Sequence, residues 1–179
     1  MFIENQLVRA DMDELNAQME SDEQLKAVLT AKGEDIPKKY LYLIGEIFPN
    51  WDKYSLYDVM NLTADKLDPS HIYFSKAGNK IVGWAAYQTN FDVKTHSEYV
   101  SEIKMFSFNL SRPNPVLLKD LKLLMDKLVE KYSVVSWMAV AENPANTIYQ
   151  KVIHSYENCV GNVETLDNGN LFYSICHKN

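Results

Sequence analysis

The sequence predicts a single α/β domain on a mixed, mostly antiparallel sheet, with one central parallel strand pair and helices on both faces. Its 179 residues are enough for one sizeable core. Strand-like alternation and helical spacing replace each other along the chain without repeats or a long linker. A long amphipathic helix stands between two strand-like segments, which must therefore lie parallel in one right-handed crossover unit.

The amino-terminal third is expected to be mainly helical after a short strand at residues 7–9. Asp11 is suited to cap a helix that continues to Gly33. Residues 37–48 have apolar positions at helical spacing behind a proline and form the next expected helix. A further helix begins at Ser55, where an aspartate three positions later gives a capping-box pattern.

The rest of the chain alternates between strands and helices. Segments 71–76, 81–89 and 98–110 have the composition of strands, and they predict an antiparallel meander with a tight turn at Gly78-Asn79. The long helix follows, with leucines along one line. The remaining expected elements are a strand at 133–140, a helix at 146–156, and a hairpin of 158–166 with 171–177 around Asn168-Gly169.

Composition and charge narrow the class of protein. The net charge is -6, and no Lys/Arg block stands out, which disfavours nucleic-acid binding. Cys159 and Cys176 lack metal-ligand spacing, and the histidines form no metal cluster. The amino terminus lacks a signal-peptide pattern, and no apolar run approaches the length of a membrane span. We therefore expect a cytoplasmic protein without a metal.

The order of elements resembles that of the GNAT superfamily, the acyl-CoA-dependent N-acyltransferases, over nearly the whole chain. The residue-level resemblance lies in "AVAENPANTIYQKV", residues 139–152. Ala145, Tyr149 and Lys151 fit the family's pattern after the strand that follows the long helix. Asn143 is one residue closer to the tyrosine than the family usually has it, and the usual Gly-Phe after this helix is missing.

The resemblance implies transfer of an acetyl group from acetyl-CoA to a primary amine, of a small molecule or a peptide, by direct attack on the thioester. The strand backbone at 106–108 is then expected to pair with the pantetheine arm. Tyr149 is expected to protonate the leaving thiolate, and Glu102 to deprotonate the amine. The expected cofactor-binding residues are Phe106, Ser107, Phe108, Arg112, Asn114, Val116, Leu117, Leu118 and Asn143.

The start of the long helix departs from the family's pattern. GNAT proteins hold the CoA pyrophosphate with R/Q-x-x-G-x-G/A, whereas the equivalent stretch here, "SRPNPVLL", has no glycine. In one interpretation Arg112 and the first free helix amides hold the phosphates. In the other, Asn114 is an N-cap, Pro115 is the first helical residue, and no ligand is involved.

Each candidate site also has a purely structural explanation. Tyr149 could be a helix tyrosine packed against the sheet, and Glu102 could belong to an exposed Glu–Lys pair on a strand face. Period-2 spacing predicts one such face, made of Glu98, Val100, Glu102, Lys104, Phe106 and Phe108. A rival function follows, a non-catalytic binding or regulatory protein of GNAT shape. Strand 171–177 is expected to be an edge that could pair across a homodimer.

Overall fold

The computed structural model describes residues 5–35, 53–108 and 113–178. The expected helix at 37–48 lies outside the described residues. The elements, in chain order, are β1 (Asn5–Arg9), α1 (Met12–Ser21), α2 (Glu23–Thr30), α3 (Leu56–Ala64), β2 (Ile72–Ala77), β3 (Lys80–Asp92), β4 (Ser97–Ser107), α4 (Pro113–Lys131), β5 (Val134–Ala139), α5 (Asn146–Val152), β6 (Cys159–Thr165) and β7 (Leu171–His177).

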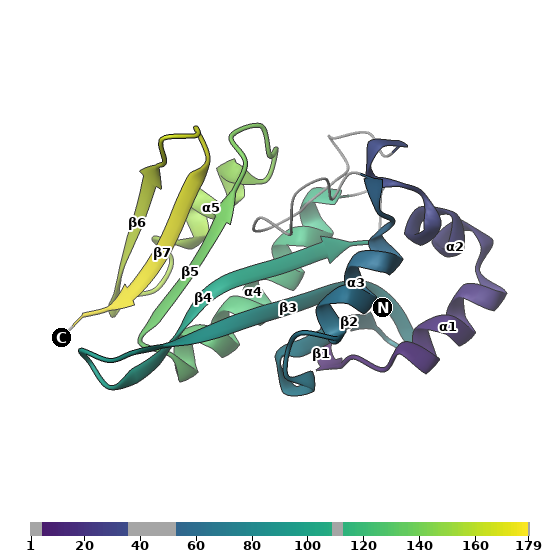
Figure 1. Ribbon diagram of the computed structural model, residues 1–179, viewed down its shortest axis with the longest axis horizontal. Helices are drawn as coiled ribbons and strands as arrows, with labels where there is room; N and C mark the ends of the chain where they lie inside the picture. The colour runs from purple at the N-terminus through teal and green to yellow at the C-terminus, as the bar shows by residue number, and fades with distance from the viewer. Residues whose placement is uncertain (1–4, 36–52, 109–112, 179) are drawn as a thin grey trace.

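The strands form one seven-stranded sheet in the order β1-β2-β3-β4-β5-β7-β6 (Figure 1). Among the strands in the described parts of the chain, only β4 and β5 pair in parallel, and the other neighbouring strands are antiparallel. The predicted fold class is therefore confirmed. The expectation that residues 171–177 form an edge strand is wrong. These residues form β7, which lies between β5 and β6, and β6 is the strand at that edge of the sheet.

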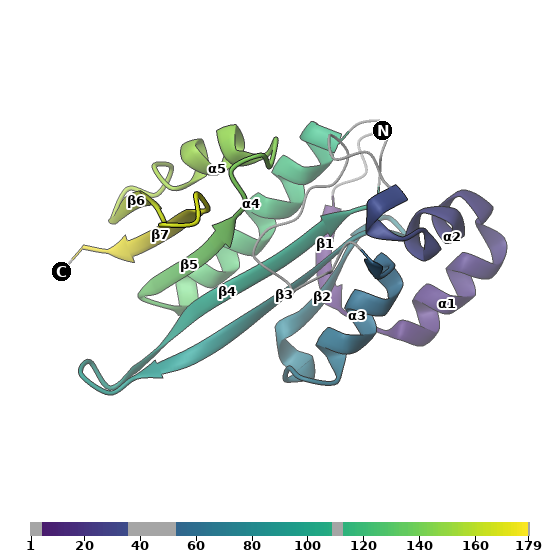
Figure 2. The ribbon, with the colours of Figure 1, turned by 45° about the horizontal axis from the view of Figure 1, so that its top comes forward.

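Helices cover the sheet on two sides. Helices α4 and α5 pack on one face over a core that includes Leu124, Trp137 and Tyr173. Helices α1, α2 and α3 pack on the other face, over a second core that includes Trp84 and Phe106. Figure 2 shows the two layers with the long strands of β3 and β4 between them. In the part of the chain that the structure describes, no helix is long and apolar enough to cross a membrane.

Local capping determines how the amino-terminal helices are divided. Asp11 accepts a hydrogen bond from the amide of Asp13 at 3.0 Å, as an N-cap should. The single helix expected up to Gly33 is instead two helices, because Asp22 takes an extended backbone and caps α2 through the amide of Leu25 at 3.0 Å. The bend leaves the apolar sides of both helices against the same core.

A bulge in β4 changes which side chains share a face. Gln88 pairs with Glu102 and Thr89 pairs with Val100, so Ser101 is an extra residue without a partner position in β3. Val100 consequently lies in the core beneath α4, whereas Glu102 alternates with residues facing α1–α3. The predicted single face running through Val100 and Glu102 is wrong, because simple alternation cannot anticipate the inserted residue.

Candidate functional site

The parallel strands β4 and β5 meet at one point and then separate. Val100 and Val135 form the only register pair between them in the described ladder. The Ser136 hydroxyl donates to the carbonyl oxygen of Val100 at 2.8 Å and ties the strands together there. Beyond this contact the strands draw apart toward their carboxyl ends (Figure 1), and we call this separation of the two strand backbones the gap. The loop from β5 to α5 therefore begins beside the carboxyl end of the gap.

The backbone of β4 presents one of the three predicted residues to the gap. The amide of Phe108 donates to the carbonyl oxygen of Val82 at 2.9 Å, so Phe108 faces β3. Backbone groups alternate in direction along a strand, so Phe106 also faces β3 and Ser107 faces away from it, toward β5. Of these three residues, Ser107 is the one whose backbone faces β5, and its pairing with a ligand stays a prediction.

The start of α4 offers fewer free amides than expected. The helix begins at Pro113 and not at Pro115, so Asn114 lies in its first turn and is not its N-cap. In a helix that starts there, the amides of Val116 and the following residues bond to carbonyls one turn back. The predicted free amides of Val116, Leu117 and Leu118 are therefore already used. Two of the three first-turn positions are prolines, which leaves the amide of Asn114.

Two other residues at this helix start were predicted to bind the cofactor. Arg112 lies outside the described residues. The Leu118 side chain is 47% exposed and so does not face the sheet. Among the described side chains of the helix, the apolar stripe facing the sheet includes Leu121, Leu124, Met125, Leu128 and Val129.

Tyr149 lies on α5 and is fully buried. Its ring meets Trp137 edge-on, with centroids 6.0 Å apart, and Tyr173 edge-on at 5.6 Å. Burial raises the pKa of the Tyr149 phenol well above its ordinary value, although the Asn143 side chain opposes this effect. The phenol therefore stays protonated at neutral pH. This aromatic packing agrees with the structural explanation of Tyr149, namely a helix tyrosine packed against the sheet.

Asparagines hold the loop that connects β5 to α5. The Asn143 side chain accepts a hydrogen bond from the amide of Ala145 at 2.9 Å. Asn146 donates to the carbonyl oxygens of Val140 and Ala141, and it accepts from the Tyr173 hydroxyl at 2.9 Å. These bonds fix the amino end of α5 against the carboxyl end of β5, beside the gap. Sequence reasoning assigned Asn143 to cofactor binding and did not assign Asn146 a role.

Glu102 lies on the other face of the sheet. Its carboxylate is 3.7 Å from the Lys104 ammonium, and the two side chains are 28% and 16% exposed. The structure thus forms the Glu–Lys pair of the structural alternative. It does not bring Glu102 and Tyr149 to the same face of the sheet. Within the described residues, no group of His, Cys, Asp or Glu side chains is arranged to hold a metal ion.

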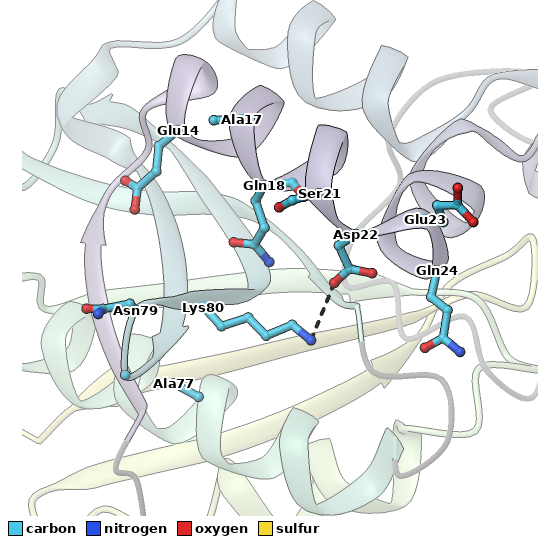
Figure 3. Close-up of a pocket in the computed structure, with 11 residues that line it drawn as sticks. Glu14, Ala17, Gln18, Ser21, Asp22, Glu23, Gln24, Ala77, Asn79 and Lys80 are labelled. Atoms are coloured by element: carbon cyan, nitrogen blue, oxygen red, sulfur yellow. Dashed lines mark hydrogen bonds and ion pairs between the residues drawn. The ribbon is translucent and has the colours of Figure 1, made fainter.

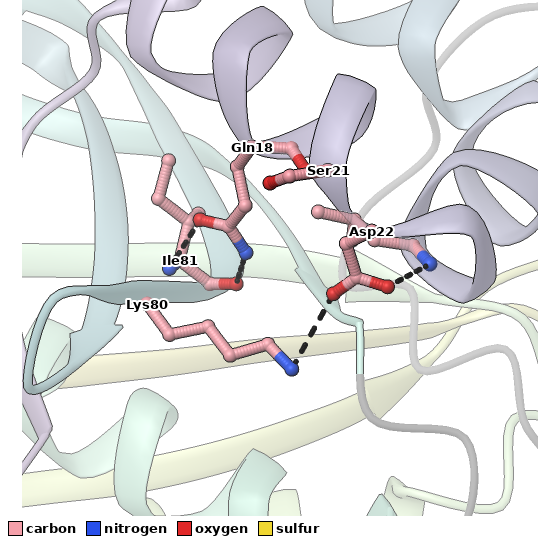
Figure 4. Close-up of polar contacts among 6 residues, drawn as sticks. Gln18, Ser21, Asp22, Lys80 and Ile81 are labelled. Carbon is pink, nitrogen blue, oxygen red and sulfur yellow. Dashed lines mark hydrogen bonds and ion pairs between the residues drawn. The ribbon is translucent and has the colours of Figure 1, made fainter.

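A separate hollow lies between α1, the start of α2 and the turn from β2 to β3 (Figure 3). Three of its polar side chains already have partners. The Gln18 amide accepts from the nitrogen of Ile81 at 2.9 Å and donates to its carbonyl oxygen at 3.1 Å, and Lys80 pairs with Asp22 at 3.4 Å (Figure 4). These contacts attach the end of α1 to the sheet.

Asp120 is a buried polar residue that sequence reasoning missed. It lies on the sheet side of α4 and is 2% exposed. The signal was present, because Asp120 stands four positions before Leu124 and therefore lies on the apolar stripe of the helix. An acidic residue at a core position is a sign of a specific polar contact.

The sequence matches no protein-family model and no curated protein. Solved structures with a similar fold do exist. An acetyltransferase of the GNAT family from Streptococcus agalactiae 2603 is 15% identical, with 100% of this chain and 99% of that chain covered and a TM-score of 0.58. An N-acetyltransferase from Staphylococcus aureus Mu50 is 14% identical, covering 97% and 99%, with a TM-score of 0.55.

A third structure was solved with a ligand. It is yncA, a putative acetyltransferase from Salmonella typhimurium with its cofactor acetyl-CoA; it is 13% identical, covers 98% of this chain and 94% of that chain, and has a TM-score of 0.54. Identities this low establish shape and not activity. Together with the strand order and the single parallel pair, they show that this chain has the GNAT fold.

Proposed function

We propose that the protein is an acyl-CoA-dependent N-acyltransferase that acetylates a primary amine. The observation that carries the proposal is the gap between β4 and β5. It opens from the contact of Val100 with Val135, and the Ser107 backbone faces into it. A strand backbone that faces such a separation can pair with an extended ligand, and the amide-containing arm of acyl-CoA is a ligand of this kind. The acetyl-CoA in the yncA structure, which shares the fold, supports this choice.

The start of α4 supplies the remaining attraction for the ligand. The dipole of a 19-residue helix favours anionic groups at its amino end. Its amide contribution is reduced by Pro113 and Pro115, so the phosphates are held chiefly by the dipole, by the Asn114 amide and by Arg112. We therefore expect weaker binding than a glycine-rich start would give.

In the proposed reaction the amine nitrogen forms a bond to the thioester carbon, and the carbon–sulfur bond breaks. The amine must first lose a proton, for which Glu102 is the candidate base, directly or through water. The departing thiolate must gain a proton, for which Tyr149 is the candidate acid. Its raised pKa keeps the phenol protonated, and because the side chain is fully buried, the groups packed around the hydroxyl must move before a thiolate can contact it.

The role of Tyr149 is tested with Tyr149→Phe, which keeps the aromatic packing and removes only the hydroxyl. If the phenol is the acid, kcat should fall by about a hundredfold or more, while the unfolding midpoint stays close to the parent value. An unchanged kcat would assign Tyr149 to packing. The matched comparison is Tyr173→Phe, since Tyr173 lies in the same aromatic group and donates its hydroxyl to Asn146.

The rival function is a GNAT-shaped protein that binds no acyl-CoA and acts as a binding or regulatory module. Two observations favour it. Prolines occupy two positions in the first turn of α4, and the Tyr149 hydroxyl is closed off from solvent. Neither the prolines nor the buried hydroxyl would impair a protein of this fold that does not bind acyl-CoA.

Isothermal titration with acetyl-CoA separates the two functions, with the parent protein and Pro115→Gly measured side by side. Micromolar binding by the parent supports the transferase, and a screen of amines by mass spectrometry would follow. No binding by either protein, with the fold confirmed by circular dichroism, would refute the transferase. Binding by the Pro115→Gly variant alone would indicate that the fold retains the shape of an acyl-CoA site but that the parent protein does not bind acyl-CoA.

A further inference from the structure

The buried carboxylate of Asp120 takes no part in the proposed acyl transfer. It projects from α4 toward the sheet and belongs to neither of the two apolar cores. Its Oδ1 accepts a hydrogen bond from the Ser75 hydroxyl at 2.6 Å. A short bond of this kind is typical of a charge-assisted contact and is directional.

The sheet offers Asp120 a socket made of three small residues. Ser75, Gly83 and Ser107 are direct cross-strand partners in β2, β3 and β4, and their positions face α4. A Cβ atom on Gly83 would lie 2.7 Å from Oδ2 of Asp120 and 2.9 Å from the carbonyl oxygen of Phe106. We call Ser75, Gly83 and Ser107 the Asp120 socket. The carboxylate fits there because the central position has no side chain.

Among the described side chains, most of the remaining contact between α4 and the sheet is apolar. Two polar contacts lie nearer the carboxyl end of the helix, where His177 Nε2 is 2.6 Å from the carbonyl oxygen of Val129 and the Lys127 ammonium is 4.8 Å from the centre of the Tyr73 ring. Leucines at successive turns, such as Leu121, Leu124 and Leu128, present similar shapes to the sheet, and apolar packing is non-directional. The apolar contacts alone would therefore allow neighbouring registers of similar energy in the amino-terminal half of the helix. A carboxylate in a glycine-lined socket allows one register, and fixing a register is the best-attested use of a buried polar group.

The socket lies next to the proposed ligand site. Ser107 is both a member of the socket and the β4 residue whose backbone faces the gap. Asp120 lies seven residues after Pro113, or about 10 Å along the helix axis. We propose that Asp120 is a positioning residue, which fixes the register of α4 on the sheet and thereby the spacing between the helix start and the carboxyl end of β4. Its importance for binding rests on the proposed function, because one acyl-CoA would have to span both places.

The register can be measured without any ligand. Nitroxide labels at Lys119→Cys and Asn90→Cys, in a Cys159→Ser, Cys176→Ser background, give the distance from α4 to the far end of β3 by double electron–electron resonance. Both labelled positions are exposed. Gly83 and Asn90 are separated by roughly 23 Å of strand, a range that the method resolves well.

Four variants decide the outcome. Asp120→Ala and Ser75→Ala should shift or broaden the distance distribution by at least about 1.5 Å, the rise of one helical residue. Asp120→Asn keeps the shape and an acceptor oxygen for Ser75, so it should keep the parent distance. Thr63→Ala removes a buried hydroxyl bond of 2.8 Å within α3, away from α4 and from both labels, and is the matched control, which should not move the labels. Unchanged distributions in Asp120→Ala and Ser75→Ala, or an equal change in Thr63→Ala, would overturn the proposal.

The link to binding needs a second titration. Acetyl-CoA touches both places, whereas its nucleotide half, 3′-phosphoadenosine diphosphate, reaches only the helix start. Asp120→Ala should weaken acetyl-CoA binding about tenfold more than it weakens binding of the nucleotide half, since a fixed spacing benefits only the spanning ligand. Equal losses for both ligands would overturn the link. If the parent binds no acetyl-CoA, the proposed function fails, and the label distances alone decide the register.

Discussion

Replacing Gly83 by alanine tests the tightness of the socket directly. The new Cβ would lie 2.7 Å from Asp120 Oδ2, 2.9 Å from the Phe106 carbonyl oxygen and 3.5 Å from the Ser75 Cβ. The first two contacts are too short for carbon and oxygen. Asp120 cannot simply turn aside, because its other oxygen is bonded to Ser75. The Phe106 oxygen belongs to the strand backbone and can yield only if β4 moves.

The magnitude is the difference between two effects. Overpacking in a well-filled core costs about 1–3 kcal/mol. Loss of a glycine makes the unfolded chain less flexible and returns about 0.4–1 kcal/mol. Gly83→Ala should therefore destabilise the protein by about 1–2 kcal/mol, which lowers the midpoint of thermal unfolding by about 2–8 °C in a chain of this size.

Urea unfolding followed by tryptophan fluorescence measures the change, and the double variant Gly83→Ala, Asp120→Ala identifies its source. Removing the carboxylate also removes the shorter of the two contacts, so alanine at 83 should destabilise the Asp120→Ala background less than the parent. Neighbouring substitutions of this kind are expected to be non-additive. A Gly83→Ala protein as stable as the parent, or more stable, would refute the reasoning, because the socket would then have room for a side chain.

Three further substitutions give distinct outcomes. Gly161→Ala should destabilise more than Gly83→Ala, by roughly 3 kcal/mol in urea unfolding, because its Cβ would lie 2.1 Å from the Ile153 carbonyl oxygen, a backbone atom. Asn146→Ala removes the 2.9 Å acceptor of the Tyr173 hydroxyl and the donor to the Val140 and Ala141 carbonyl oxygens, and it should cost about 1–3 kcal/mol by the same assay. Asp22 has a pKa below its ordinary 3.8 because the Leu25 amide donates to its carboxylate. The stabilisation that the ionised carboxylate gives is therefore present above about pH 4 and is lost as the pH falls. Asp22→Asn should make the melting temperature depend less steeply on pH between about pH 5 and pH 3.

Local chemistry made most of the elements predictable. Asp11 and Ser55 cap helices as their side chains suggest. Gly78 and Gly169 both have positive φ at the two predicted hairpin turns, with values of 64° and 86°. Because one long helix between two strands requires a parallel pair, the order of elements was enough to predict the mixed sheet.

The errors share a different cause. The bulge at Ser101, the helix break at Asp22 and the inward position of β7 depend on how segments pack after they have formed. A period-2 pattern continues through a bulge in the sequence but not in space. The sequence around Asp22 is compatible with one continuous helix and with two helices of which Asp22 caps the second. Only packing against the sheet decides that α1 ends before Asp22.

The candidate site combines two parts that depend on sequence in different ways. The gap beside β4 is made by backbone, so the strand order and the Ser136 contact with Val100 produce it whatever side chains line it. The start of α4 depends on which residues can donate, and Pro113 and Pro115 remove two donors without disturbing the helix. A chain can therefore keep the GNAT shape and its strand edge while the phosphate end weakens. For this reason the shared fold alone does not decide between transferase and binding protein, and the affinity for acetyl-CoA does.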